Sequence, residues 1–160
     1  MKILVIDDTQ IQRAHAITAL AVHDVTVAEG WGLAKYLLEE ERWDLVLTDL
    51  SMPAESDGQG NEGLKYVGQP TPYGFPLALL ALKLGVPKVA IVSNGQGEDG
   101  NHHAHPIFWA SDELHGEIIP GRLWAFTGYD CPHMDKESLP GVEKPYYIKD
   151  WATVVKTATA

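Results

Sequence analysis

Three short apolar runs place the strongest constraint on how this chain can fold. They span residues 2–6, 44–48 and 89–92 and are apolar at nearly every consecutive position. Such runs are typical of strands that are buried on both faces of a parallel sheet. Segments with helical spacing separate them. The alternation of strand and helix predicts an α/β fold in which a parallel sheet lies between two layers of helices.

The segments between these runs predict the helices and the remaining strands. In residues 9–21, Ile11, Ala14, Ile17 and Ala21 recur at helical spacing, which predicts that they form the buried face. Further strands are expected at residues 25–28 and 123–127. The other expected helices are residues 31–41, residues 77–84 between Pro76 and Gly85, a short one at 107–114, and a last helix capped by Asp150.

The length of 160 residues fits a single domain, residues 1–160. We expect a flavodoxin-like three-layer sandwich with a five-stranded parallel sheet. Two segments rich in Gly, Pro and polar residues, at about 50–73 and 94–141, are longer than most loops of compact domains. Both follow the carboxyl ends of predicted strands, where open α/β sheets place their functional sites.

Composition excludes several classes of partner. The chain has 12 Lys and Arg against 22 Asp and Glu, a net charge of −10, which argues against binding to nucleic acid. No apolar stretch approaches the roughly 20 residues that cross a bilayer, so no membrane contact is expected. Cys131 is the single cysteine and has no partner for an internal disulfide. A cytoplasmic location follows as an expectation.

Three carboxylates are expected to meet at one edge of the sheet. Asp7 and Asp8 directly follow the first strand, and Asp49 directly follows the third. If these strands are neighbours, the three side chains lie together at the carboxyl edge. Like charges at this spacing oppose one another's ionisation. A divalent cation relieves that conflict, and Mg²⁺ suits oxygen ligands of this kind.

Two further residues complete a candidate site for a phosphoryl group. Ser93 ends the fourth strand and offers a hydroxyl, and Lys144 offers an ammonium group near the end of the chain. With the carboxylates and Mg²⁺, these groups could hold a phosphoryl group on an aspartate oxygen. The carboxylate would be the nucleophile, and the cations would neutralise the phosphoryl charge.

The chain resembles the receiver domains of two-component response regulators in the segments that carry these residues, 3–8, 47–53, 91–93 and 143–145. The resemblance implies a phosphoacceptor that is not itself an enzyme. The phosphoryl group would come from a histidine kinase or a phosphotransfer protein, and an output protein would be reached by direct contact. The resemblance implies that Asp49 is the phosphoacceptor and that Mg²⁺ is bound by Asp7, Asp8, Asp49 and the backbone carbonyl of Ser51. It implies that Ser93 supplies the switch hydroxyl and that the ammonium group of Lys144 pairs with the phosphoryl group. It also implies a cis Lys144–Pro145 bond.

Two alternatives remain open. A degenerate receiver would bind a partner without being phosphorylated. Asn94 and Gly141 favour it, because receivers usually carry a small residue and an aromatic residue at these places. A Mg²⁺-dependent aspartyl-phosphate phosphatase is the other alternative. It requires an acid two residues after the nucleophile of the first strand, where this chain has Thr9.

Two other features are candidate binding sites. The six residues His102, His103, His105, His115, Cys131 and His133 include ligands that Zn²⁺ accepts, although they lack zinc-finger spacing. Residues 75–84 are apolar on all sides of a helix. Such a helix is either buried in the core or available for a homodimer contact.

Overall fold

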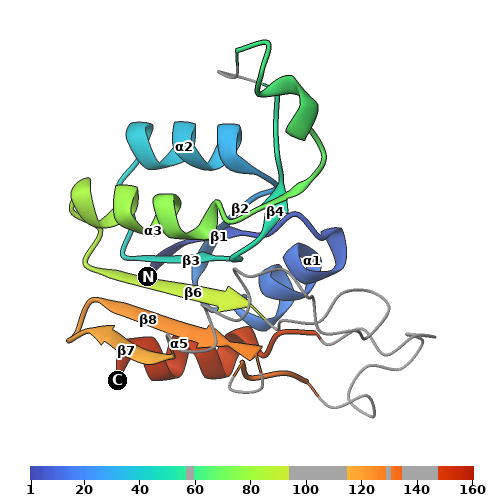
Figure 1. The fold of residues 1–160 in the computed structure, drawn as a ribbon. Coiled ribbons are helices and arrows are strands. Elements are labelled where there is room, and N and C mark those ends of the chain that lie inside the picture. Colours follow the sequence, from blue (N-terminus) through green and yellow to red (C-terminus); the bar gives the residue numbers. More distant parts are fainter. Residues whose placement is uncertain (57–59, 94–114, 129–130, 135–147) are drawn as a thin grey trace.

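The computed structural model describes residues 1–56, 60–93, 115–128, 131–134 and 148–160. Its helices and strands alternate along the chain as expected (Figure 1). The elements are β1 (Lys2–Ile6), α1 (Gln10–Ala19), β2 (Asp24–Ala28), α2 (Trp31–Glu40), β3 (Leu45–Thr48), β4 (Met52–Pro53), the 3-10 helix η1 (Leu64–Tyr66), β5 (Pro70–Thr71), α3 (Gly74–Lys83), β6 (Lys88–Ser93), β7 (Gly116–Ile119), β8 (Leu123–Thr127) and α5 (Trp151–Thr159).

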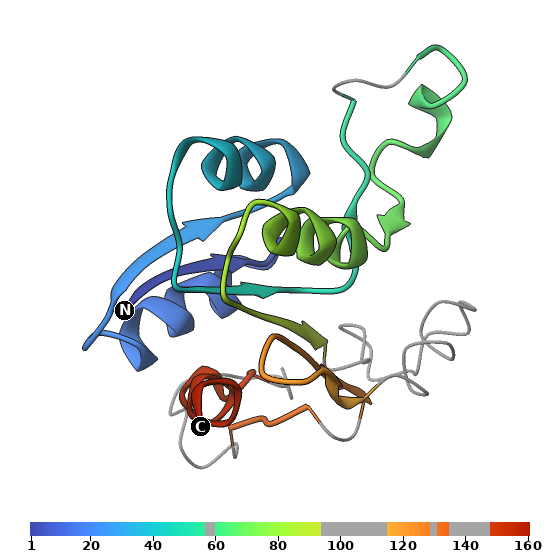
Figure 2. The same ribbon diagram turned by 90° about the vertical axis from the view of Figure 1, so that its left-hand side faces the viewer.

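The central sheet has six strands in the order β2-β1-β3-β6-β8-β7. The first five are parallel, as expected, and β8 confirms the strand predicted at residues 123–127. Helices α2 and α3 cover one face of the sheet, and α1 and α5 cover the other (Figure 2). This is an α/β sandwich of three layers, compatible with a flavodoxin-like fold.

The prediction of a five-stranded sheet is wrong by one strand. The additional strand, β7, pairs antiparallel with β8 at the edge of the sheet. The two strands form a hairpin whose turn contains Gly121 at φ +69°, a conformation that glycine adopts without strain. All four residues of β7 are exposed. Because neither face of β7 is buried, its sequence lacks the apolar pattern that identifies a strand.

The first long loop also contains more structure than expected. Within residues 50–73, strands β4 and β5 form a short antiparallel pair, and η1 lies between them. This segment extends away from the sheet on the side of α2 and α3 (Figure 2). It returns to the sheet where α3 begins, so both of its ends lie near the carboxyl end of β3.

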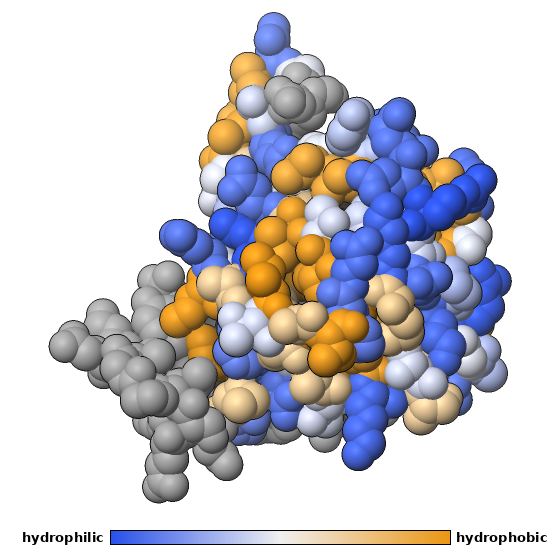
Figure 3. Space-filling view, turned by 180° about the vertical axis from the view of Figure 1, so that it is seen from behind, coloured by the Kyte–Doolittle hydropathy of each residue, from blue (hydrophilic) through white to orange (hydrophobic). Residues whose placement is uncertain are grey.

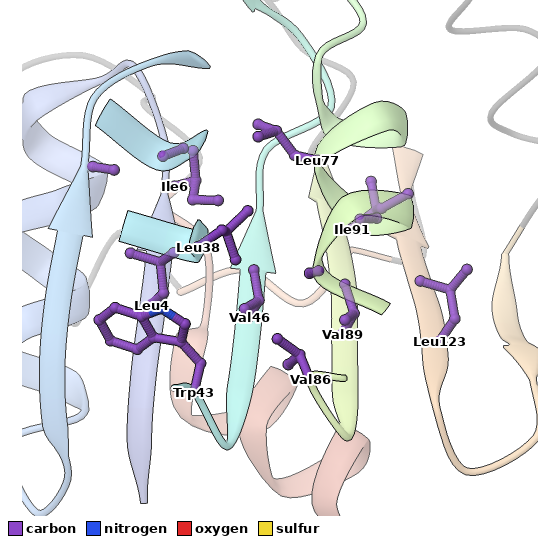
Figure 4. Close-up of a cluster of buried hydrophobic side chains, with 14 of the residues drawn as sticks. Leu4, Ile6, Leu38, Trp43, Val46, Leu77, Val86, Val89, Ile91 and Leu123 are labelled. Carbon is purple, nitrogen blue, oxygen red and sulfur yellow. The ribbon is translucent and has the colours of Figure 1, made fainter. Parts of the chain in front are cut away.

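Two apolar clusters hold the layers together, because successive side chains of a strand point to opposite faces. Leu4, Ile6 and Val46 point towards α2 and α3, where Leu38 and Leu77 pack against them (Figure 4). The alternate residues of the same strands pack against α1 and α5. The strands are therefore apolar on both faces, and this is why runs of consecutive apolar residues predicted them correctly.

Helix α1 buries a different face from the one expected. The buried residues of α1 are Gln12 and Ala16, whereas Ile17 is 50% exposed. The prediction that Ile11, Ala14, Ile17 and Ala21 form the buried face is therefore wrong. The reason is a tertiary contact, since Gln12 hydrogen-bonds to the start of α5. Spacing of apolar residues cannot reveal a buried glutamine of this kind.

The ends of two helices match their expected signals. Gly85 follows α3 at φ +87°, the left-handed conformation common at helix ends. The carboxylate of Asp150 accepts a hydrogen bond from the backbone N–H of Thr153, at 3.0 Å, and so caps α5. The short helix predicted at residues 107–114 lies outside the described residues.

Candidate functional site at the carboxyl edge of the sheet

Strands β1 and β3 bring Asp7 and Asp49 together. The strands are neighbours in parallel register, with Ile6 beside Thr48. The backbone N–H of Asp49 continues their ladder by donating to Ile6 O at 2.7 Å. Both aspartates therefore leave the same edge of the sheet one residue beyond a buried strand. This is the convergence that the sequence predicted for these two carboxylates.

An ammonium group lies between these two carboxylates. Lys149 Nζ is 2.6 Å from Asp7 Oδ2 and 2.8 Å from Asp49 Oδ1. The Lys149 and Asp7 side chains are 3% and 1% exposed, and that of Asp49 is 14% exposed. The bridge is therefore almost completely removed from water, and Asp49 is its most accessible member.

Contacts between α1 and α5 hold Lys149 in place. The backbone N–H of Lys149 donates to Gln12 Oε1 at 3.0 Å, and Trp151 Nε1 donates to Gln12 O at 3.2 Å. A single residue of α1 thus binds the chain on both sides of Asp150, the cap of α5. Gln12 is a positioning residue for the lysine, and this explains why a glutamine occupies the buried face of α1.

The prediction for Lys144 falls outside the described residues, as does the predicted cis Lys144–Pro145 bond. The ammonium group that reaches Asp7 and Asp49 belongs to Lys149 instead. A signal for Lys149 was present in the sequence. A helix that follows a parallel strand begins at the carboxyl edge of the sheet, and Lys149 directly precedes the cap of α5. Lys144 lies five residues further back, but the Lys-Pro pair made it the more conspicuous candidate.

Burial and neighbouring charges raise the pKa values of Asp49 and Lys149. Burial raises the pKa of Asp49 to about 7; the Lys149 ammonium opposes that shift and the Asp7 carboxylate adds to it. Burial alone would lower the pKa of Lys149, but the attraction of Asp49 and Asp7 outweighs it, and the net shift is upward. One ammonium group thus contacts two buried carboxylates, and the pKa of Asp49 stays above its ordinary value.

Asp8 adds a further negative charge. Burial raises the pKa of its carboxyl group, and the neighbouring Asp7 raises it further. Arg13 binds the backbone here, since its Nη1 donates to the carbonyl oxygens of Asp7 and Asp8, both at 2.7 Å. The N–H of Thr9 donates to Asp7 Oδ1 at 2.9 Å. The turn after β1 is therefore held by specific contacts. Sequence reasoning identified neither Arg13 nor Gln12 as part of it.

Ser93 and Ser51 lie on neighbouring segments of the same edge. Ser93 is the last residue of β6, next to β3, and is 4% exposed. Ser51 lies two residues after Asp49 and is partly buried. Both are placed as the sequence predicted, at the carboxyl edge. The roles predicted for their oxygen atoms remain predictions.

Gly74 fixes the backbone that follows Asp49. Its N–H donates to Leu50 O at 3.0 Å. A Cβ atom at this position would overlap Asp49 O and would lie 2.7 Å from Leu50 Cα. Only glycine allows the first turn of α3 to come so close to β3. The sequence analysis did not single out this glycine, because its role depends on a contact between segments more than twenty residues apart.

The donor atoms of the site suit Mg²⁺, but they are not arranged around an ion. Asp7, Asp8 and Asp49 offer the oxygen ligands that Mg²⁺ prefers. However, Lys149 Nζ lies between Asp7 and Asp49. Within the described residues, no three His, Cys, Asp or Glu side chains are grouped to hold a metal ion. Binding would require the lysine or the carboxylates to move.

The second candidate metal set is only partly described. His102, His103 and His105 lie outside the described residues. Of the others, His115 is exposed beside β7, Cys131 is buried and His133 is exposed. Burial raises the pKa of the Cys131 thiol to about 12, which opposes formation of the thiolate that binds Zn²⁺.

Comparison with models of known protein families gives no match, and comparison with curated proteins gives none either. Across the part of the chain that the structure describes, no helix combines the length and the apolar character needed to cross a membrane.

Proposed function

We propose that this chain is a receiver that accepts a phosphoryl group on Asp49, with Lys149 in the role first expected for Lys144. The observation that carries the proposal is the buried Lys149 ammonium between Asp7 and Asp49, at 2.6 and 2.8 Å. The five parallel strands follow the flavodoxin-like order, and Asp49 follows the central one, β3. A histidine kinase or a phosphotransfer protein would be the donor, in the cytoplasm.

In the proposed step, an oxygen of the ionised Asp49 carboxylate attacks the phosphorus of a phosphohistidine. The oxygen–phosphorus bond forms and the phosphorus–nitrogen bond breaks, and the departing imidazole keeps the electron pair and takes up a proton. Lys149 Nζ remains beside Asp49 and neutralises charge on the phosphoryl oxygens. Ser93 would donate its hydroxyl hydrogen to one of them.

Mg²⁺ would be held by Asp7, Asp8, Asp49 and the carbonyl of Ser51, and it would supply positive charge to the phosphoryl oxygens. Charge balance supports this assignment. Asp7, Asp8 and Asp49 carry three negative charges when ionised, and Lys149 compensates one of them. Burial is the largest cause of the raised pKa of Asp49 and of Asp8, and the neighbouring carboxylate of Asp7 adds to it. A divalent cation would lower both pKa values and keep Asp49 ionised, as a nucleophile must be.

The second candidate is a receiver that binds a partner without being phosphorylated. The position of Lys149 favours it, because the ammonium fills the space between two of the three carboxylates. A closed bridge of this kind can serve stability alone. The phosphatase alternative has no comparable support, since Thr9 still stands where its second acid is required.

Phosphorylation by acetyl phosphate separates these functions. With Mg²⁺ present, we expect intact-mass measurement to show one phosphoryl group per chain, stable in acid and lost in base. The Asp49→Asn variant should acquire none. The matched control is Asp44→Asn, because Asp44 lies at the opposite end of β3, where it accepts a hydrogen bond from Lys2 N at 2.7 Å. That variant should be phosphorylated like the wild type.

Three results would contradict the proposal. Absence of any adduct would favour the binding module. An adduct that survives Asp49→Asn would place the acceptor elsewhere. Steady turnover of a simple phosphate ester that requires Asp7 would favour the phosphatase.

A further inference from the structure

Strand β2 forms an open edge of the sheet. It pairs with β1 on one side, and in the described part of the chain no strand lies on its other side. Helices α1 and α2 flank this edge on the two faces of the sheet. Seen from behind, the same face of the molecule has hydrophobic residues gathered near its centre (Figure 3). An open edge with apolar surroundings is a template for pairing with another strand.

Some backbone N–H and C=O groups of β2 point away from the sheet. The N–H of Asp24 bonds to Met1 O, and Ala28 O accepts from Asp7 N, both at 3.0 Å. Residues 24, 26 and 28 therefore face β1. Because the N–H and C=O groups of successive residues alternate between the two edges of a strand, those of Val25 and Val27 point away from the sheet.

Apolar side chains are exposed on α1 and α2, the two helices that flank this edge, and in the turn before β2. Ile17 in α1 is 50% exposed and Val22, in the turn before β2, is 88% exposed. On the other face, Leu33 and Tyr36 in α2 are 45% and 60% exposed. Each of these four large hydrophobic residues is at least 45% exposed to water. A partner that extended the sheet beyond β2 would cover them with its own flanking helices.

We propose that the occupant of this edge is β2 of a second copy of the chain, antiparallel and centred on Thr26. In this register, Val25 of each copy lies opposite Val27 of the other, so all four outward N–H and C=O groups of each copy are paired. The two Thr26 residues face each other on the two-fold axis. An antiparallel register centred on any other residue of β2 leaves some of these N–H and C=O groups without a hydrogen-bond partner.

Complementary side chains favour a second copy over an unrelated strand, because an imidazole N–H can donate a hydrogen bond to a carboxylate. The same register places His23 of each copy opposite Glu29 of the other, and Asp24 opposite Ala28. No like charges meet across the axis. The Glu29 side chain is 75% exposed, and its contact with Arg13 Nη2, at 3.6 Å, is long. It is therefore accessible to a second partner, and the cross-strand pair would occur twice in the dimer.

The dimer would leave both phosphoacceptor sites accessible. Antiparallel strands point the carboxyl edges of the two sheets in opposite directions, so the two Asp49 sites would face away from each other. The dimer does not depend on phosphorylation, and the proposal can fail or succeed independently of the proposed function.

The test is sedimentation velocity of the full chain over a wide range of concentration. We expect a reversible monomer–dimer equilibrium for the wild type. Val25→Pro removes an outward N–H and leaves the residues that bond to β1 in place, so we expect loss of the dimer. Circular dichroism and thermal melting verify that the variant is folded. A persistent dimer in folded Val25→Pro would overturn the proposal, as would a wild type that is monomeric at every concentration.

A charge exchange supplies a second test that leaves the backbone unchanged. His23→Glu places like charges opposite each other twice and should weaken the dimer about three- to tenfold. Adding Glu29→Lys should restore it, because the new pair has charges of opposite sign. Glu40→Lys, at the far end of α2, is the matched control for that change in net charge and should not rescue His23→Glu. Rescue by Glu40→Lys, or no rescue by Glu29→Lys, would contradict the register.

Discussion

Lys149 Nζ donates a hydrogen bond to Asp49 Oδ1 at 2.8 Å, across 100 residues of sequence. The same ammonium group binds Asp7 at 2.6 Å. This contact joins the start of α5 to the carboxyl ends of β1 and β3. It is both the core of the candidate site and a buried polar contact on which the stability of this edge depends.

We expect Lys149→Met to destabilise the protein at neutral pH by about 3–5 kcal/mol, because Asp7 and Asp49 lose their shared buried cation. The loss should shrink in acid, where the carboxylates can be protonated instead. Urea unfolding at several pH values measures both effects. Lys156→Met, at an exposed position of the same helix, is the matched control. A loss of stability equal in both variants would contradict the bridge.

The raised pKa of Asp49 predicts how stability depends on pH. In the folded protein the pKa is about 7, above the ordinary value of 3.8, so the folded state binds the proton more tightly than the unfolded state. The wild type should lose stability as the pH rises from about 4 to 7, relative to Asp49→Asn. The free energy of unfolding of the wild type should fall, relative to that of Asp49→Asn, by at most about 1.4 kcal/mol per pH unit. Above pH 7 the difference between the two proteins should be constant.

The measurement for Asp49 is the free energy of unfolding of both proteins across this pH range. Asp44→Asn, at the other end of β3, is the control. If the wild type instead gained stability relative to Asp49→Asn as the pH rose, the direction of the pKa shift would be wrong. Phosphorylation by acetyl phosphate should become faster as Asp49 ionises, because the ionised carboxylate is the nucleophile, and bound Mg²⁺ should move this rise to lower pH.

Gly74→Ala is expected to cost about 1–3 kcal/mol, since the added methyl group overlaps the backbone beside Asp49. It should also slow phosphorylation, because α3 can accept the methyl group only if residues 49–50 move. Gly60→Ala is the control, as nothing lies within 4 Å of a Cβ atom there. Thermal melting and the acetyl phosphate reaction are the two measurements. Stability and reaction rate unchanged from the Gly60→Ala values would contradict the close approach.

Glu55 links the segment after Asp49 to the start of α2. Its Oε2 accepts from Gly32 N at 2.9 Å, and its carboxylate occupies the space that a Cβ of Gly30 would take. A carboxylate at a helix N-terminus is stabilising. Glu55→Gln should therefore cost about 1 kcal/mol and speed hydrogen exchange of the Gly32 amide. Glu62→Gln, where the side chain is 97% exposed, should do neither.

The sequence was informative where one local pattern decided the outcome. Uniformly apolar runs located the parallel strands, and Asp150 and Gly85 marked helix ends. The positions of Asp7 and Asp49 followed from strand order alone. The sequence failed where long-range contacts overrode local pattern. Gln12 is buried because of its bonds to residues near 150. Strand β7 is exposed on both faces, so its edge pairing with β8 left no apolar pattern to read.

By itself, the sequence determined the layers of the fold and the edge at which its carboxylates lie. The reason is that a strand buried on both faces has consecutive apolar residues, which can be recognised in the sequence. Only the tertiary structure decided which cation joins the carboxylates. The start of α5 is positioned by Gln12 and Trp151, and this packing brings Lys149 to Asp7 and Asp49. Which of several lysines reaches a site depends on how helices dock, and helix docking is a property of the whole chain.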